Sequence, residues 1–472
     1  MELPKYFDFG PIIDFAYEQC ETLNIVSFKS WKPDQFSDLN YILMYNKDGG
    51  IGWRPFELIN PLIYAFCVRL ITQAENWQTI RDRFSEFSKG MVECCSIPVV
   101  ADQEKGAKKF QILNWWKKVE QRSLELSLEY SHLSHTDVSN CYPSIYSHSI
   151  GWAIHGRGFL KIKKNRLNNE LLGNALDIAL RGSREGQTNG IPQASMLSHI
   201  LAELILGYCD TLISEKLKGE DVKILRYRDD YRIFGHSDTS CAKALKVISE
   251  CLNEFGMKLG ASKTVNASNT IVGAVKQEKL DALEVKTNQK TLQKELLLIH
   301  RYALKRPGSG AIKFLLSEFW EHLTKRIERD QLAIENKTVL VAILMDISAI
   351  SPQVFPAAAT AVSHILQTLE PKDAANLFSL VLKRTSRVPN NGYMEIWLQR
   401  IALPNKIDFL SNEQMCRSLQ SDQPSIWNFS WVEDKNLRTA LENYSIIDHL
   451  QIEGLEKTIQ REEFDAFWHG YR

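Results

Sequence analysis

One short stretch, ILRYRDDYRIFG at residues 224–235, constrains the fold more than any other part of the 472-residue sequence. Apolar and polar residues alternate on both sides of two adjacent acids, Asp229 and Asp230, and this pattern predicts two antiparallel strands joined by a tight turn. The turn contains neither glycine nor asparagine, which most often form such turns. An acidic pair at the tip of a hairpin is usually a solvated turn, so the pair alone does not indicate a function.

A third acid, Asp137, follows another strand-like pattern in SHTDVSNCYPSIY, residues 134–146, and precedes aromatic residues. Three clustered carboxylates repel one another unless one is protonated or a cation lies between them, because unit charges about 4 Å apart cost on the order of 4 kcal/mol near a protein surface. Mg²⁺ takes oxygen ligands and is often shared between carboxylates and substrate phosphates. The three acids therefore indicate phosphoryl transfer on a nucleotide.

The segment after Gly190 and Pro192 predicts one long helix, because apolar residues recur there at steps of three and four. This stripe consists of Leu197, Ile200, Leu201, Leu204, Ile205, Tyr208 and Leu212. The stripe itself indicates core packing, so the functional interest lies in the loop IPQAS, residues 191–195, that leads into the helix.

The chain changes character near residue 285. Before it, helical patterns mix with strand-like runs, and after it apolar residues follow helical spacing between turn signals at Pro371, Pro389 and Pro404. We therefore expect an α+β fold over residues 1–285 followed by an all-α-helical C-terminal domain over residues 286–472.

Composition limits the classes of protein only weakly. Lys plus Arg and Asp plus Glu both number 57, so the overall charge does not indicate a nucleic-acid partner. No uninterrupted apolar run approaches a membrane span, the N-terminal MELPKYFDFG lacks the features of a signal peptide, and the nine cysteines contain no CxxC pair. We expect a cytoplasmic protein with free thiols and no membrane segment.

Four stretches together resemble the motifs of reverse transcriptases. In order along residues 134–264, they are SHTDVSNCYPSIY, NGIPQASMLSHILAEL, RYRDDYRIFG and EFGMKLGASKT. Three further stretches, NKDGGIGWRPFELINPLIYAF, QILNWWKKVEQ and HSIGWAIHG, are similar to bacterial defence-associated reverse transcriptases of the unknown-group and abortive-infection kind. Those enzymes carry a helical C-terminal extension.

The resemblance implies a right-hand-like polymerase palm and fingers over residues 1–285 and an RNA-directed DNA polymerase that uses dNTPs. It implies two Mg²⁺ ions, with Mn²⁺ as a substitute, and catalysis by Asp137, Asp229, Asp230 and Lys263. The metal ligands it implies are Asp137, Asp229, Asp230 and the carbonyl of Val138. Lys263 would protonate or neutralise the departing pyrophosphate, unless it is a solvated loop lysine.

The resemblance also implies a nucleotide pocket. Tyr142 falls where the family places a steric gate against a ribose 2′-hydroxyl. The alternative is a buried core aromatic, and the two roles can coexist because the ring would pack under the sugar. The pocket would be completed by Gln193, Ala194, Ser195 and Arg54. Ala194 stands where the family commonly has glycine, which affects how closely the backbone can approach a ligand. Arg54 is the candidate contact for the triphosphate, because arginine binds phosphate through paired donors.

Nucleic acid has a candidate surface of its own. HGRGFLKIKKNR, residues 155–166, contains five Lys or Arg, no acid and one Phe, a composition that can follow a phosphate backbone. The candidate contacts are Lys161, Lys163, Lys164 and Arg166, together with Arg228, which is bulkier than the usual family residue and could meet primer phosphate or offset the carboxylates. EKGAKKFQILNWWKKVEQR, residues 104–122, is similar in composition. A solvated basic face is the alternative for both segments.

Several activities remain open within this resemblance. Some members copy an associated noncoding RNA, whereas others add nucleotides without a template and prime from a protein tyrosine, for which the exposed-looking Tyr393 in PNNGYMEIW is a candidate. An RNA polymerase and an inactive nucleic-acid-binding scaffold are further alternatives, although three retained acids argue against the scaffold. We expect a role in antiphage defence and, through the helical C-terminal domain, a surface that could form a homo-oligomer.

Overall fold

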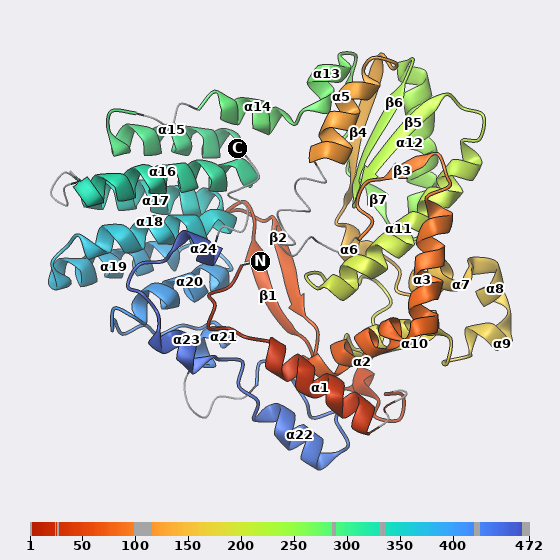
Figure 1. Ribbon diagram of the computed structural model, residues 1–472, viewed down its shortest axis with the longest axis horizontal. Coiled ribbons are helices and arrows are strands. Elements are labelled where there is room, and N and C mark those ends of the chain that lie inside the picture. The colour runs from red at the N-terminus through yellow and green to blue at the C-terminus, as the bar shows by residue number, and fades with distance from the viewer. Residues whose placement is uncertain are drawn as a thin grey trace.

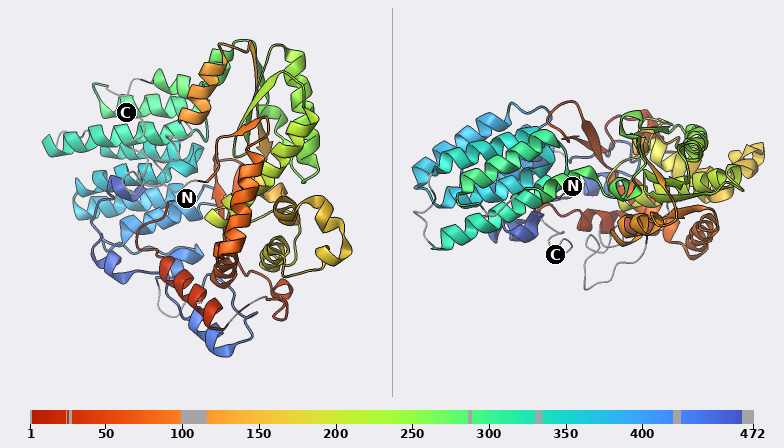
Figure 2. Two further views of the ribbon diagram at one scale, coloured as in Figure 1. Left: turned by 45° about the vertical axis from the view of Figure 1, so that its right-hand side comes forward. Right: turned by 90° about the horizontal axis from the view of Figure 1, so that it is seen from above.

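The computed structural model describes residues 2–23, 25, 28–98, 116–285, 289–329, 334, 336–419 and 425–464. They form two bodies side by side, one of mixed helices and strands and one of stacked helices (Figure 1). Seen from above, the two bodies lie in one flat layer (Figure 2). The expected α+β fold with a helical C-terminal region is confirmed.

A six-stranded sheet carries the three acids. Its order is β3-β5-β6-β4-β7, with β8 also paired to β4, and only β3 and β5 run parallel. The strands are β3 (Val92–Cys94), β4 (His132–Ser139), β5 (Val222–Tyr227), β6 (Asp230–Gly235), β7 (Lys258–Leu259) and β8 (Val265–Ala267). β5 and β6 form the antiparallel hairpin that the alternating sequence predicts, with Arg228 and Asp229 between them.

Both faces of this sheet are covered by helices. Ile224, Tyr231 and Ile233 face the main core, into which α11 (Met196–Lys216) and α12 (Asp238–Asn253) pack. Leu225 and Phe234 belong to a second cluster on the other face, beside α5 (Arg122–Leu126) and α13 (Thr270–Ala274). Alternate strand residues therefore serve opposite faces, as strand geometry requires.

The long helix predicted after the IPQAS loop is α11. It is the one described helix long and apolar enough to cross a membrane by length and composition, but 67% of that apolar window is buried inside the protein. Two acids on it, Glu203 and Asp210, are also buried. α11 is thus the central core helix of the mixed body.

The remaining elements of the mixed body surround α11 or precede it. They are α1 (Gly10–Thr22), β1 (Tyr41–Asn46), β2 (Trp53–Leu58), α2 (Pro61–Thr72), α3 (Ala74–Phe87), α6 (Cys141–Ser144), α7 (Ser149–His155), α8 (Arg157–Lys161), α9 (Lys163–Arg166) and α10 (Leu172–Gly182). β1 and β2 form a separate two-stranded sheet between the two bodies (Figure 1). Its turn requires Gly49, because a Cβ there would lie 2.0 Å from the carbonyl oxygen of Ala349.

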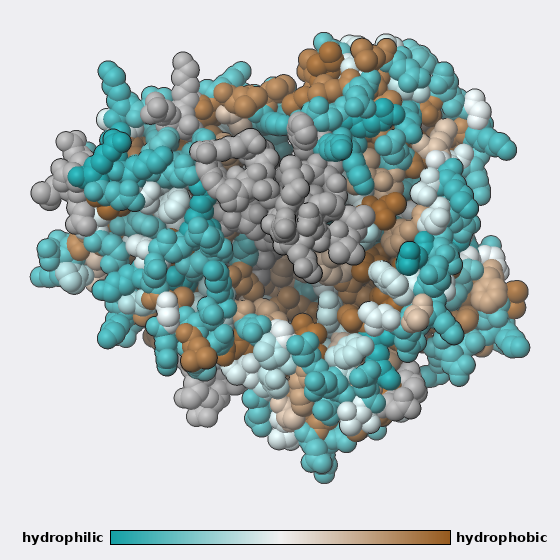
Figure 3. All heavy atoms as spheres, in the orientation of Figure 1, coloured by the Kyte–Doolittle hydropathy of each residue, from teal (hydrophilic) through white to brown (hydrophobic). Residues whose placement is uncertain are grey.

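The C-terminal helices form two layers, because most helices pack against the second helix along the chain as well as the next. Before them comes α14 (Gln277–Leu283), and the stack itself consists of α15 (Leu292–Lys305), α16 (Gly310–Arg329), α17 (Lys337–Ile350), α18 (Phe355–Gln367), α19 (Pro371–Thr385) and α20 (Gly392–Ala402). Shorter helices α21 (Gln414–Arg417), α22 (Lys435–Glu442), α23 (His449–Glu453) and α24 (Arg461–Phe464) follow. The visible face of the stack is mainly hydrophilic (Figure 3).

The first residues of the chain pack with the last third. The amide of Asp8 donates to the carbonyl of Ile446 at 2.9 Å, the amide of Asp448 donates to the carbonyl of Tyr6 at 2.9 Å, and the Tyr6 hydroxyl donates to Gln399 at 3.3 Å. The predicted division after residue 285 falls beside residues 286–288, which lie outside the described residues.

Candidate active site

The three acids meet where β4 ends and the turn between β5 and β6 begins. Asp137 and Asp230 are direct partners in the antiparallel register of β4 and β6, so their side chains leave the same face of the sheet. Asp229 lies in the turn, and its carbonyl accepts a hydrogen bond of 2.9 Å from the amide of Val138. The fold therefore brings together all four residues that the resemblance named as metal ligands.

Two lysines lie against this acidic pair. Lys263, in the short 3-10 helix η3 (Ala261–Lys263), forms an ion pair with Oδ2 of Asp137. Nζ of Lys276 lies 3.5 Å from Oδ2 of Asp230. The lysines offset the repulsion between two carboxylates that face each other across the strands.

The ionised form of Asp229 is disfavoured within the cluster. Burial raises the pKa of Asp229 above its ordinary value, and the neighbouring charges of Asp230 and Asp137 raise it further. The guanidinium of Arg54, on β2, opposes this rise. Arg54 is exposed on β2, and its charge reaches this carboxylate.

The cluster fits a divalent cation by the chemistry of its donors, although no three His, Cys, Asp or Glu side chains among the described residues already stand in a metal-binding arrangement. Oδ1 of Asp137 is buried and has no hydrogen-bond partner. A Cβ at Gly260 would lie 2.4 Å from this oxygen, so any side chain there would displace the carboxylate. A buried carboxylate oxygen without a partner is costly, and a cation would satisfy it.

The turn at the tip of the hairpin is strained. Arg228 has a φ of +55°, a left-handed conformation that costs a non-glycine residue about 1–2 kcal/mol. Its amide donates to Oγ of Ser96 at 2.7 Å, and its guanidinium lies over the ring of Tyr227 with 5.7 Å to the centroid. The backbone of Arg228 thus has a structural role that its long side chain did not suggest.

Sequence reasoning missed Arg226, which is fully buried beneath the turn. Its guanidinium donates to Asp210 at 2.7 Å, to Glu203 at 3.0 Å and to the carbonyl of Arg228 at 3.0 Å. Sγ of Cys94 lies 3.1 Å from its third nitrogen. A signal for this network is visible in the sequence: two acids interrupt the apolar helix pattern seven residues apart, on one helical face.

The IPQAS loop joins α11 to β2. The carbonyl of Gln193 accepts a hydrogen bond of 3.1 Å from the amide of Glu57, and Ser195 caps α11 by accepting from the amide of Ser198 at 3.1 Å. Ala194 has a φ of +117°, which residues with a Cβ rarely adopt. The backbone at Ala194 therefore has the conformation that the glycine common in the family adopts freely.

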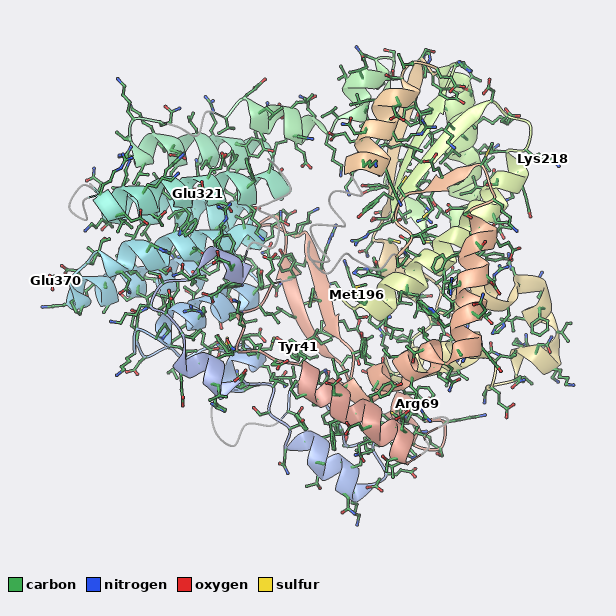
Figure 4. All side chains as sticks on the ribbon, in the orientation of Figure 1. Tyr41, Arg69, Met196, Lys218, Glu321 and Glu370 are labelled. Atoms are coloured by element: carbon green, nitrogen blue, oxygen red, sulfur yellow. The ribbon has the colours of Figure 1, made fainter. Side chains whose placement is uncertain are left out.

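Tyr142 lies between the acids and this loop. Its carbonyl accepts from the amide of Ile191 at 2.9 Å, and its hydroxyl lies 2.6 Å from Nδ1 of His199. Met196, labelled in Figure 4, marks the end of α11 that points toward β2 across the middle of the molecule. The predicted pocket residues Tyr142, Gln193, Ala194 and Ser195 thus border the same region as the acids.

The basic segment does not join this cluster. α8 and α9 project from the outer edge of the mixed body, away from β1, β2 and the C-terminal helices (Figures 1 and 2). Lys161, Lys163, Lys164 and Arg166 are exposed, and Phe159 is 45% exposed beside them. Of the second basic segment, residues 104–122, the part up to residue 115 lies outside the described residues.

The expectation that Tyr393 is exposed is wrong. Tyr393, the second residue of α20, is 4% exposed, and its ring lies 5.2 Å from that of Tyr45 on β1, in an edge-on arrangement. The polar sequence around it misled the prediction, because β1 covers the residue from more than 300 positions away. A hydroxyl enclosed in this way is not placed to receive a nucleotide.

Comparison with known proteins gives one family match. Residues 62–296 match the model of the family described as reverse transcriptase (RNA-dependent DNA polymerase). No curated protein matches the chain. Similar solved structures include apo telomerase from Candida tropicalis (14% identity, TM-score 0.32, covering 80% of this chain and 67% of that one) and telomerase from Candida albicans in complex with a telomeric RNA fragment (12% identity, TM-score 0.32, covering 73% and 66%).

Proposed function

Residues 62–296 form a reverse transcriptase domain, that of an RNA-directed DNA polymerase, and from this premise we propose that the chain makes DNA from dNTPs at Asp137, Asp229 and Asp230. One observation carries the proposal. Three acids, one each from β4, from β6 and from the turn between β5 and β6, converge beside two lysines, and one buried carboxylate oxygen has no partner. This is a donor set for divalent cations next to groups that can meet a triphosphate.

The residues of the site divide the work of nucleotidyl transfer. Asp137, Asp229, Asp230 and the carbonyl of Val138 would hold two Mg²⁺ or Mn²⁺ ions, which supply activation of a 3′-hydroxyl and neutralisation of phosphate charge when bound. The primer 3′-oxygen forms a bond to the α-phosphorus, the bond to the β-phosphate oxygen breaks, and pyrophosphate leaves. The proton of the hydroxyl passes to water.

Two basic residues act on the phosphates. Lys263 is ion-paired with Asp137, and from this place beside the acids it would neutralise or protonate the departing pyrophosphate. Arg54 is exposed on β2, its charge acts on Asp229, and it would bind the triphosphate through paired donors. The backbone and side chains at 193–195 line the nucleotide, and Tyr142 excludes a 2′-hydroxyl.

An RNA template and the DNA product complete the proposed partners. The basic residues Lys161, Lys163, Lys164 and Arg166 are exposed donors for a phosphate backbone.

The similarity of residues 46–66, 111–121 and 148–156 to bacterial defence-associated reverse transcriptases supports a role in defence against phage. Expression of the chain in a phage-sensitive bacterium should lower the plating of phage, and Asp229→Ala should abolish that protection.

Nucleotide incorporation tests the proposed reaction. The purified chain is incubated with Mg²⁺, a primed RNA template and one labelled dNTP or NTP, and we expect incorporation of the dNTP. The double variant Asp229→Ala with Asp230→Ala should lose it. A matched control replaces two highly exposed acids near the opposite end of the hairpin, Asp221→Ala with Asp238→Ala.

The outcomes separate the candidate activities. Incorporation that survives in the first double variant would refute the site. Incorporation of NTPs alone would indicate an RNA polymerase. Product that forms without added nucleic acid and stays attached to the protein would favour template-independent, protein-primed synthesis over copying.

A further inference from the structure

Tyr142 is held at both of its ends. Tyr142 lies on α6, five residues after Asp137, and its backbone carbonyl accepts from Ile191 at 2.9 Å. At the other end its hydroxyl lies 2.6 Å from Nδ1 of His199, in the first turn of α11, and the two rings meet edge-on with their centroids 5.8 Å apart. A tyrosine ring fixed at backbone and hydroxyl has little freedom to turn.

The bond between Tyr142 and His199 joins two neutral groups. Burial and, to a smaller extent, the charge of Arg228 lower the pKa of His199 to about 4, against the opposing charge of Glu203. Burial raises the pKa of the Tyr142 hydroxyl. Both groups are therefore uncharged at neutral pH, and the hydrogen bond between them does not depend on the salt concentration.

His199 stands on the helix that also supports the catalytic turn. Glu203 lies one turn further along α11 and accepts a hydrogen bond from Arg226, whose guanidinium donates to the carbonyl of Arg228. The same helical face thus positions the ring of Tyr142 and the turn that carries Asp229. A displacement of one relative to the other would require α11 to deform or one of these hydrogen bonds to break.

We propose that His199 sets the preference for deoxynucleotides by holding the ring of Tyr142 as a fixed wall against the ribose 2′-hydroxyl. The proposal deepens the proposed function and rests on it. A steric wall rejects one extra oxygen atom only when it cannot yield, because a small rotation of a free ring would make room for a hydroxyl. His199 is then a positioning residue that acts through Tyr142 and does not itself contact the reacting atoms.

The test compares how well four proteins discriminate between dATP and ATP. They are the wild type, two single variants and the double variant that carries both substitutions. His199→Leu keeps bulk and removes the hydrogen-bonding nitrogen, and Tyr142→Phe keeps the ring and removes the hydroxyl. Single-nucleotide incorporation on one primed RNA gives kcat/KM for each nucleotide. In each single variant we expect the kcat/KM for dATP divided by that for ATP to fall about five- to ten-fold. This is the scale of one neutral hydrogen bond.

The double variant decides whether the two residues act as a unit. If His199 works through the Tyr142 hydroxyl, the double variant loses no more discrimination than either single variant. His199→Asn, whose amide can bond the hydroxyl from nearly the same place, should restore most of the ratio. Discrimination that is unchanged in His199→Leu, or losses that multiply in the double variant, would overturn the proposal.

Controls separate this proposal from misfolding and from the function beneath it. His364→Leu removes another partly buried histidine of lowered pKa, on α18, and should leave the ratio unchanged. A melting temperature for each variant identifies any that are unfolded, and Tyr142→Phe, the smallest change, then carries the test. Equal use of dATP and ATP by the wild type would refute the role of Tyr142 as a wall without contradicting the polymerase activity. Use of neither nucleotide would contradict the proposed function itself.

Discussion

Asp137 on β4 lies directly opposite Asp230 on β6, so the two strands place like charges on one face where they pair most closely. Such a pair is unfavourable in a sheet. Lys263 and Lys276 each bind one of the two carboxylates, and the free protein thereby holds its acids together with its own cations. Because Lys263 binds Oδ2 of Asp137 and Oδ1 has no partner, a divalent ion bound at Oδ1 would share this carboxylate with Lys263.

Asp229→Asn should raise the melting temperature in cation-free buffer and abolish incorporation. The pKa of Asp229 is raised in the folded protein, so the folded state binds the proton more tightly than the unfolded state does. Stability from this group is present below its ordinary pKa, about 4, and is lost as the pH rises through the raised value. The gain in the variant should therefore be small near pH 4 and reach full size above the raised pKa, in melting curves recorded across pH.

Asp281→Asn is the matched control for that charge effect. Hydrogen bonds from Lys305 and then Arg306 lower the pKa of Asp281 to about 2, so its ionised form stabilises the fold and the variant should melt lower at neutral pH. Added Mg²⁺ should raise the melting temperature of the wild type and have little effect on Asp229→Asn. A variant of Asp229 that melts below the wild type at pH 7 would contradict this account.

The meeting of Asp137 with the acids of the hairpin was predicted from the resemblance to reverse transcriptases, whereas local patterns in the sequence were sufficient for the hairpin and for α11. Each depends on alternation or helical spacing within one segment, which burial enforces directly. The burial of Tyr393 could not be predicted in this way. β1 packs against α20 across most of the chain, and nothing in the PNNGY sequence records that contact.

The same limit applies to Arg226. In the sequence, an arginine in the middle of a strand is indistinguishable from any other polar residue of an alternating pattern. Only the fold shows that Glu203, Asp210 and the carbonyl of Arg228 surround it. The unusual residue that the sequence did expose, Arg228, owes its position partly to this network. Its strained backbone is held by Arg226 on one side and Ser96 on the other.

Ala194→Gly should raise the free energy of unfolding by about 1 kcal/mol, because glycine adopts a φ of +117° without the strain that a Cβ introduces. Chemical denaturation measures the change. The control is Ala202→Gly, in the middle of α11. It should lower the free energy of unfolding by about 1 kcal/mol or more, since glycine is unfavourable inside a helix and the side chain of Ala202 is buried. Loss of stability in both variants would mean that Ala194 is not strained.

Arg226→Met should lower the free energy of unfolding by about 3–5 kcal/mol, because it leaves Glu203 and Asp210 buried without their cation. Incorporation should fall as well, since the carbonyl of Arg228 loses its donor. Adding Asp210→Asn to Arg226→Met removes one of the uncompensated charges and should recover part of the stability. A double variant less stable than Arg226→Met alone would show that the two residues are not coupled as a charge pair.

Replacing Lys161, Lys163 and Lys164 together with Gln should weaken RNA binding and make it less sensitive to salt. Each lysine that neutralises a phosphate of a single strand contributes about 0.7 to the slope of log affinity against log salt, so the slope should become shallower by about 2. Fluorescence anisotropy with a labelled RNA, titrated at several salt concentrations, measures both effects. The control makes the same substitution at three exposed lysines of other helices, Lys246, Lys372 and Lys435. Parallel salt lines for the wild type and the first variant would show that α8 and α9 do not contact the RNA, since lost phosphate contacts must change the slope.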